Sequence, residues 1–124
     1  MSAGNPLFDH LRDLHAHMAW ADAVWFHTWA GSGHQDDPDL LQRMQHTADV
    51  QGAFLMVLQD QEVLFPGDPP VPGFDRLRAL TQVAMHTQHH RGQCMTRLKA
   101  LGGKPQNVDY IIWAWKNRPE GRWD

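Results

Sequence analysis

The chain has 124 residues and a formal net charge of −3, from 11 Lys and Arg against 14 Asp and Glu. This length suits one domain, and the absence of a basic cluster argues against a nucleic-acid-binding surface. No apolar stretch approaches the roughly 20 residues that a membrane span needs, so we expect no membrane contact. A single cysteine fits a reducing compartment. Residues 1–7 lack a basic segment followed by an apolar run, so we expect no signal peptide and a cytoplasmic protein.

Start and stop signals predict two long helices in the first half of the chain. The first helix is predicted to begin at Asn5-Pro6, a capping residue followed by proline, and to end at Gly31. The second repeats the start signal at Asp37-Pro38 and is predicted to run to about residues 60–62. In both segments apolar residues recur every three or four positions, which is the period of a helix with one buried face.

The second half of the chain predicts one more long helix and a short one. Residues 63–73 contain four prolines, which predicts an extended, semi-rigid linker. A long helix is predicted from about Asp75 to Leu101, closed by Gly102-Gly103. A short helix is predicted to carry Tyr110 to Trp115, and residues 116–124 are expected to be a loosely held tail. We find no strand pattern, so the fold is predicted to be one all-α domain with its core in about residues 6–115.

Three histidines are candidate ligands for one divalent metal ion. His86 and His90 are four residues apart, so they share one face of the third helix. A helical wheel places both at the border of its apolar stripe, whereas His89 points to solvent. On the second helix, His46 borders the apolar arc in the same way. The alternatives are a solvated histidine pair and a hydrogen-bonded core histidine. Three imidazoles leave coordination positions open, as catalytic sites do.

Other polar residues near these stripes allow two readings each. His17 either lines a pocket near the metal or marks the border of the first helix's apolar stripe. Cys94 lies four residues after His90 and is either a fourth ligand or reactive thiol, or else a small buried hydrophobe, which is the favoured reading. Arg91 points into the apolar stripe, where an unpaired cation is costly. We therefore expect it to pair with Asp22 or Asp49, unless the helix is rotated and Arg91 reaches water.

The run His86-Thr87-Gln88-His89-His90-Arg91-Gly92-Gln93, followed by Leu101-Gly102 and Pro105-x-x-x-Asp109, resembles a signature of the DinB/YfiT-like family of metalloenzymes. Trp20-Ala21-Asp22 is similar to a motif in that family's first helix, and His46 matches a ligand histidine early in its second helix. The similarity covers most of residues 7–115.

The resemblance implies a DinB-like up-and-down helical bundle. It also implies that His46, His86 and His90 hold one divalent metal ion per chain, Ni²⁺ or Zn²⁺. We assign supporting or structural roles around these ligands to three further residues, namely Arg91, Asp22 and Gln93.

The predicted architecture departs from the family in one respect. Family members have four long helices, and this chain has room for three, because the linker at residues 63–73 replaces one of them. One side of the bundle is then left open. We expect either that residues 63–73 and 108–115 cover it, or that two chains pair there as a homodimer, which is the favoured outcome. Sedimentation that shows only monomer at high concentration would contradict pairing.

The resemblance implies the transfer of a low-molecular-weight thiol to an electrophilic small molecule, since similar enzymes are thiol-dependent S-transferases. A metal on three neutral imidazoles lowers the pKa of a bound thiol or water. The substrate is expected beside His17, Trp20 and Trp25. One alternative is a metal-hydroxide hydrolase, although no Glu is placed near the ligands as an acid or base. A second is a non-catalytic, metal-binding or stress-related dimeric module.

Overall fold

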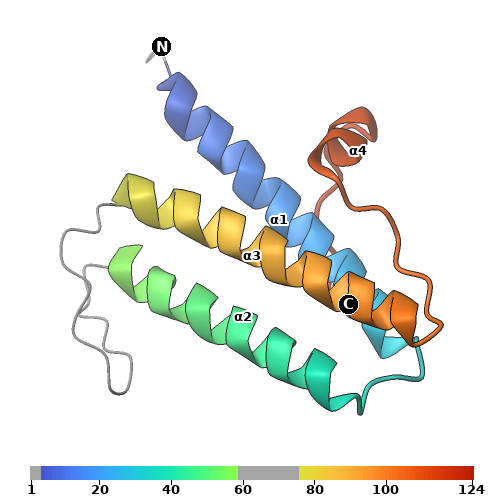
Figure 1. The fold of residues 1–124 in the computed structure, drawn as a ribbon. Coiled ribbons are helices and arrows are strands. Elements are labelled where there is room, and N and C mark those ends of the chain that lie inside the picture. The colour runs from blue at the N-terminus through green and yellow to red at the C-terminus, as the bar shows by residue number, and fades with distance from the viewer. Residues whose placement is uncertain (1–3, 59–75) are drawn as a thin grey trace, which may run out of the picture.

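The computed structural model describes residues 4–58 and 76–124, and these residues form helices and no strand. There are four helices (Figure 1): α1 (Pro6–Ala30), α2 (Pro38–Leu58), α3 (Arg76–Ala100) and α4 (Tyr110–Trp115). The prediction of an all-α chain is therefore confirmed for the described part. The predicted linker at residues 63–73 and the expected end of the second helix lie outside the described residues.

The helix ends follow the capping chemistry read from the sequence. The Asn5 side chain accepts a hydrogen bond from the Leu7 amide at 3.0 Å, and the Asp37 carboxylate accepts one from the Leu40 amide at 3.0 Å. Each carboxamide or carboxylate satisfies an amide that has no partner within its helix. Gly102, two residues after the end of α3, has a φ of +93°, a conformation that costs glycine little. No helix in the described ranges is long and apolar enough to cross a bilayer.

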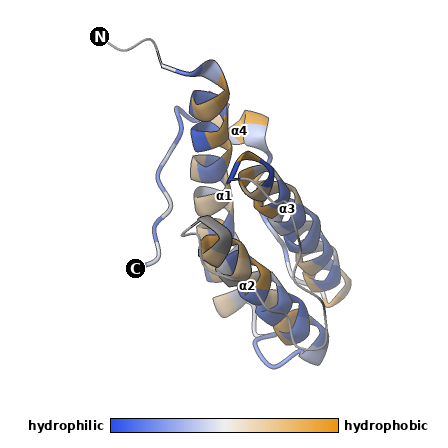
Figure 2. Ribbon diagram, turned by 90° about the vertical axis from the view of Figure 1, so that its left-hand side faces the viewer, coloured by the Kyte–Doolittle hydropathy of each residue, from blue (hydrophilic) through white to orange (hydrophobic). Residues whose placement is uncertain are grey.

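Helix α3 is the central element of the fold. It packs against α2 on one side and against α1 on the other, and it runs antiparallel to α2 (Figure 1). In the turned view of Figure 2, α2 and α3 lie alongside each other while α1 is inclined to both. The backbones of α1 and α2 stay further apart than those of the other two pairs of long helices, and the two helices meet through their side chains. Within residues 4–58 and 76–124, no fourth long helix covers the side between α1 and α2.

Two apolar clusters hold this arrangement together. The first joins α1 to the segment that carries α4, and its buried members are Trp20, Ala21, Val108 and Trp113. The second joins α1, α2 and α3, and its buried members are Trp25, Leu40, Cys94 and Leu98. Each fully buried Leu or aromatic side chain contributes roughly 1.5–3 kcal/mol relative to exposure, so both clusters stabilise the helix positions.

Residues 108–115 do not cover the open side, which corrects part of one expectation; residues 63–73, expected to cover it together with them, lie outside the described residues. Residues 108–115 pack against α1 and against Met95 of α3. The large apolar indole of Trp113 is buried in this contact, with 1 % of the residue exposed. The tail, expected to be loosely held, instead follows α1 (Figure 2). His27 Nε2 donates to the carbonyl of Arg122 at 2.7 Å, and the Trp123 ring lies 5.7 Å from that of Phe26.

A buried polar network links the three long helices. The Arg91 guanidinium on α3 is 3 % exposed and donates to the Asp22 carboxylate of α1 at 2.7 Å. The Gln51 amide on α2 donates to Asp22 and to Thr87 Oγ1 of α3, both at 3.1 Å. Arg91 also donates to the Gln88 side chain. The expectation that Arg91 pairs with a buried acceptor is confirmed, and the acceptor is Asp22.

We expect Asp22→Ala to destabilise the chain by about 3 kcal/mol, because it leaves the Arg91 guanidinium buried without its counter-ion. The matched control is Asp13→Ala, which breaks an ion pair with Arg118 whose side chains are 30 % and 62 % exposed. That pair is worth less than about 1 kcal/mol. Urea unfolding followed by circular dichroism measures both variants. Equal losses in the two would contradict a special role for the Asp22–Arg91 pair.

Candidate metal centre

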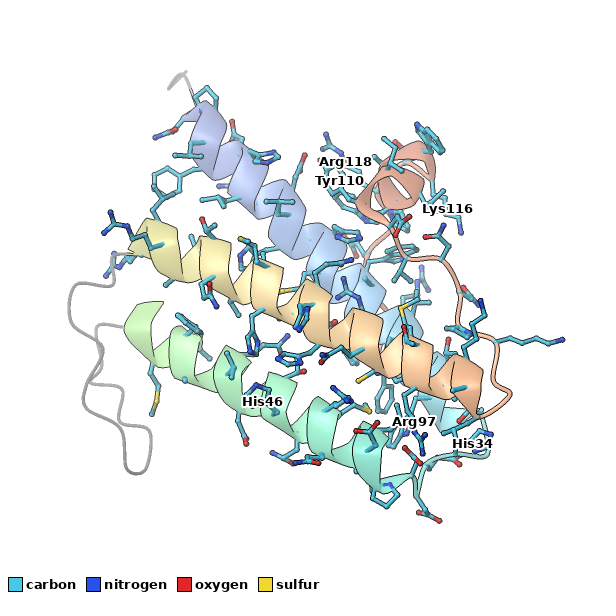
Figure 3. All side chains as sticks on the ribbon, viewed as in Figure 1. His34, His46, Arg97, Tyr110, Lys116 and Arg118 are labelled. Carbon is cyan, nitrogen blue, oxygen red and sulfur yellow. The ribbon has the colours of Figure 1, made fainter. Side chains whose placement is uncertain are left out.

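The three predicted ligand histidines meet where α2 and α3 pack together. His46 projects from α2 (Figure 3), and His86 and His90 project from successive turns of α3. One ring nitrogen from each lies within 4.8 Å of the other two. His86 and His90 are half-buried, whereas His46 is exposed. The structure therefore brings together the three residues that the sequence selected, at a position that solvent can reach.

The spacing of the rings suits a single metal ion. Nε2 of His90 lies 3.1 Å from Nε2 of His86. Two imidazole nitrogens that bind one ion at about 2.1 Å lie roughly 3.0–3.4 Å apart, for octahedral to tetrahedral angles. The ring centroids of His46 lie 5.1 Å from His86 and 4.7 Å from His90. Three histidines lie close enough to hold a divalent ion, and they supply the nitrogen donors that such ions bind.

A side-chain amide fixes which nitrogen His90 offers to an ion. Nδ1 of His90 donates to Gln93 Oε1 at 2.7 Å, so Nε2 keeps its lone pair for the metal. The Arg43 guanidinium also donates to Gln93 Oε1, at 2.9 Å. Because a guanidinium cannot accept a hydrogen bond, Arg43 holds the Gln93 amide with its oxygen toward both donors. Gln93 thus has the supporting role that the sequence assigned to it.

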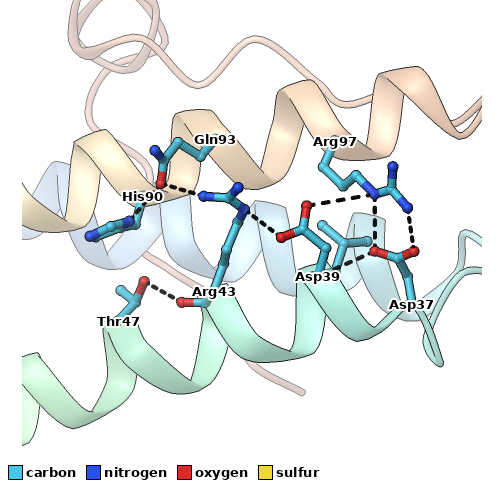
Figure 4. Close-up of polar contacts among 8 residues, drawn as sticks. Asp37, Asp39, Arg43, Thr47, His90, Gln93 and Arg97 are labelled. Carbon is cyan, nitrogen blue, oxygen red and sulfur yellow. Dashed lines mark hydrogen bonds and ion pairs between the residues drawn. The ribbon is translucent and has the colours of Figure 1, made fainter.

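Arg43 is in turn held by a row of charged residues along the packed faces of α2 and α3 (Figure 4). Its Nε donates to Asp39 at 2.9 Å, and Asp39 lies 3.7 Å from the Arg97 guanidinium. Arg97 donates to Asp37 at 2.8 Å. The hydrogen bond from Arg97 lowers the pKa of the Asp37 carboxyl. Acidic and basic side chains thus alternate from the start of α2 to Arg43, which contacts His90 through the Gln93 amide.

His86 is adapted to bind an ion in its neutral form. Burial lowers its pKa, and the neighbouring rings of His90, His46 and His89 lower it further. A metal ligand must carry a free lone pair, so this shift favours coordination. Nδ1 of His86 is buried and has no hydrogen-bond partner among the described residues. His86 therefore lacks the support that Gln93 gives to His90.

His89 and Cys94 do not join the ligand group. His89 is exposed on α3, as the helical wheel predicted. The Cys94 thiol lies in the apolar cluster of Trp25, Leu40 and Leu98, and burial raises its pKa to about 11. A protonated thiol is a poor ligand and a poor nucleophile. Among the described residues, the group that could hold a metal consists of the three histidines alone.

The three residues expected around a substrate lie in two different places. His17 is buried and its Nε2 donates to the Val108 carbonyl at 2.6 Å, and burial lowers its pKa. Its ring packs near Trp20 and Trp113, so His17 and Trp20 belong to the cluster beneath α4. Trp25 lies in the other cluster with Cys94. The structure does not assemble His17, Trp20 and Trp25 into one pocket.

Several supporting residues could not be selected from the sequence. Arg43 contacts Gln93 across 50 positions of the chain, and Gln51 contacts Asp22 across 29 and Thr87 across 36. All three pairings join different helices, so they depend on helix rotation and register. The one available signal for Arg43 is its place three residues before His46, on the same side of α2.

Comparisons with known protein families, with curated proteins and with solved structures find no match to this chain.

We expect Gln93→Leu to weaken metal binding by about 10- to 100-fold, because Nδ1 of His90 loses its acceptor and the ring loses its fixed tautomer. The matched control is Gln82→Leu, an exposed position on the same helix. Competition with a chromophoric chelator measures Zn²⁺ affinity in both variants. Equal affinities for Gln93→Leu and wild type would show that the amide does not support the site.

Proposed function

We propose that the chain is a metal-dependent enzyme of the DinB-like family, which transfers a low-molecular-weight thiol to an electrophilic small molecule. The observation that carries the proposal is the convergence of His46, His86 and His90 without a fourth protein ligand among the described residues. Structural zinc sites are closed by four protein ligands, whereas catalytic sites keep a position open. A site of three imidazoles therefore favours catalysis over a structural role.

Accessibility supports the same proposal. His46 is exposed, and His86 and His90 are half-buried, so the histidine group lies at a partly solvent-exposed position. A divalent ion held there, Ni²⁺ or Zn²⁺ in this proposal, lowers the pKa of a thiol or water bound to it. Neutral imidazoles leave the full positive charge of such an ion in place.

The chain's own residues would orient and limit the reaction. Gln93 and Arg43 hold the ring of His90 in one tautomer, which fixes the direction of its lone pair. Asp39 holds Arg43, so its carboxylate is engaged in an ion pair. The group around the three histidines contains no carboxylate in the described part of the chain, which favours thiol transfer over hydrolysis, since hydrolysis needs a general acid or base.

The homodimer expected from the sequence is part of the proposal. Helix α2 exposes apolar side chains, with Leu55 at 54 %, Leu41 at 44 % and Met56 at 44 %. A soluble monomer seldom leaves a large contiguous apolar area in water, so a second chain is a suitable partner for this helix.

We expect purified protein incubated with Zn²⁺ or Ni²⁺ to hold about one ion per chain. His90→Ala should lose the ion, because only two of the three histidine ligands would remain. The matched control is His89→Ala, which removes the neighbouring exposed imidazole and should keep the ion. Elemental analysis by mass spectrometry after desalting measures all three proteins.

A protein that retains no metal under these conditions would contradict the proposal, and the non-catalytic module would become the better account. Equal loss in His89→Ala and His90→Ala would show non-specific binding to a histidine-rich surface. With one ion bound, transfer of bacillithiol, mycothiol or glutathione to an electrophile such as monobromobimane, measured against the His90→Ala background, tests the reaction itself.

A further inference from the structure

A cavity of about 150 Å³ lies on the open side of the fold, between α1 and α2. Its walls are largely apolar. Trp25 and Phe26 of α1 form one wall, Met44 and Ala48 of α2 form the facing wall, and Cys94 of α3 lies between them. Side chains from all three long helices therefore line one hollow, which is partly open to solvent because the backbones of α1 and α2 stay apart.

The C-terminal tail supplies a fourth side of this cavity. Trp123 lines it, and its ring lies 5.7 Å from that of Phe26 at an interplanar angle of 45°. The hydrogen bond from His27 to the Arg122 carbonyl anchors the tail beside α1. The cavity stays partly open to solvent on this side, since Trp123 is itself 56 % exposed, so a small molecule can enter beside the tail.

The charges in the wall cancel each other. Asp22 and Arg91 both line the cavity, and they are paired at 2.7 Å. The Cys94 thiol is protonated and uncharged near neutral pH, since its pKa is raised to about 11. A charged ligand would lose its hydration without finding a free counter-ion. The wall chemistry therefore selects an uncharged molecule.

The volume sets the size of the ligand. An apolar protein cavity of about 150 Å³ holds a molecule the size of benzene. Aromatic walls favour an aromatic guest through stacked or edge-to-face ring contacts, and a thioether such as that of Met44 also contacts rings favourably.

We propose that this cavity binds a compact, uncharged molecule with a single aromatic ring, at a site separate from the metal centre. None of the three ligand histidines lines the cavity. Thr47 and Arg91, which do line it, directly follow His46 and His90 in the sequence. Consecutive helical residues point about 100° apart, so the two sites use different sides of the same two helices. The proposal does not depend on the proposed enzymatic function.

Benzyl alcohol is the probe, and benzoate, which carries the same ring with a negative charge, is the matched control ligand. Spectra that correlate ¹H and ¹⁵N report the indole N–H groups, assigned with single Trp→Phe variants. We expect benzyl alcohol to shift the Trp25 and Trp123 signals saturably and to leave that of Trp113, in the other cluster, unchanged. Benzoate should produce no saturable shift at the same concentrations.

Two variants locate the binding site. Ala48→Phe places a ring in the cavity from the facing wall and should remove the saturable shift. Ala16→Phe, at an exposed alanine of α1 that does not line the cavity, should keep it. His90→Ala should also keep it, so failure of this proposal and failure of the metal proposal are distinguishable.

A direct contact measurement in the wild type keeps the test decisive if Ala48→Phe does not fold. Nuclear Overhauser effects from the probe's ring protons should reach the Met44 methyl group and not that of the exposed Met85. Shifts that rise linearly at all indoles, or no contact with Met44, would overturn the proposal.

Discussion

Arg91 carries its charge into the most buried stripe of α3, where a guanidinium is tolerated only if acceptors surround it. Asp22 of α1 supplies the counter-charge, and Gln51 of α2 connects that carboxylate to Thr87 of α3. These contacts matter because the backbones of α1 and α2 stay apart and the two helices meet only through their side chains. The network around Arg91 is therefore a polar contact that all three long helices share, and it constrains how each helix is rotated about its axis.

Helix rotation in turn determines where the histidines point. Thr87 directly follows His86, and Arg91 directly follows His90. When Thr87 and Arg91 point into the core, the two histidines therefore point toward α2. Along the other side of the α2–α3 contact, Gln93 and Arg43 fix the tautomer of His90. The histidine group thus depends on two polar networks, one beneath it and one beside it. A polar core of this kind costs stability relative to an apolar one and defines a specific arrangement.

Much of the fold and the ligand set follow from local chemistry. Caps at Asn5 and Asp37 predict the helix starts, and the four-residue spacing of His86 and His90 predicts a shared face. The predicted burial of Arg91 requires a partner for its charge, and Asp22 is the one of the two proposed carboxylates that it contacts. By contrast, the helical wheel does not predict where α4 and the tail pack. Short segments pack wherever an apolar surface is still uncovered, and here that surface is on α1. The same holds for the expectation that His17 lines a substrate pocket. The sequence shows which face of the first helix carries His17, but not that Val108 and Trp113 pack against it.

X-ray absorption at the metal edge of the Zn²⁺-loaded protein tests the central claim most directly, which is an open site of three imidazoles. The account predicts nitrogen scattering from three histidine rings at about 2.0–2.1 Å, a further light atom from solvent, and no sulfur. Scattering from sulfur at about 2.3 Å would contradict the account, because Cys94 would then close the site and α3 would have to rotate away from the Asp22–Arg91 pair.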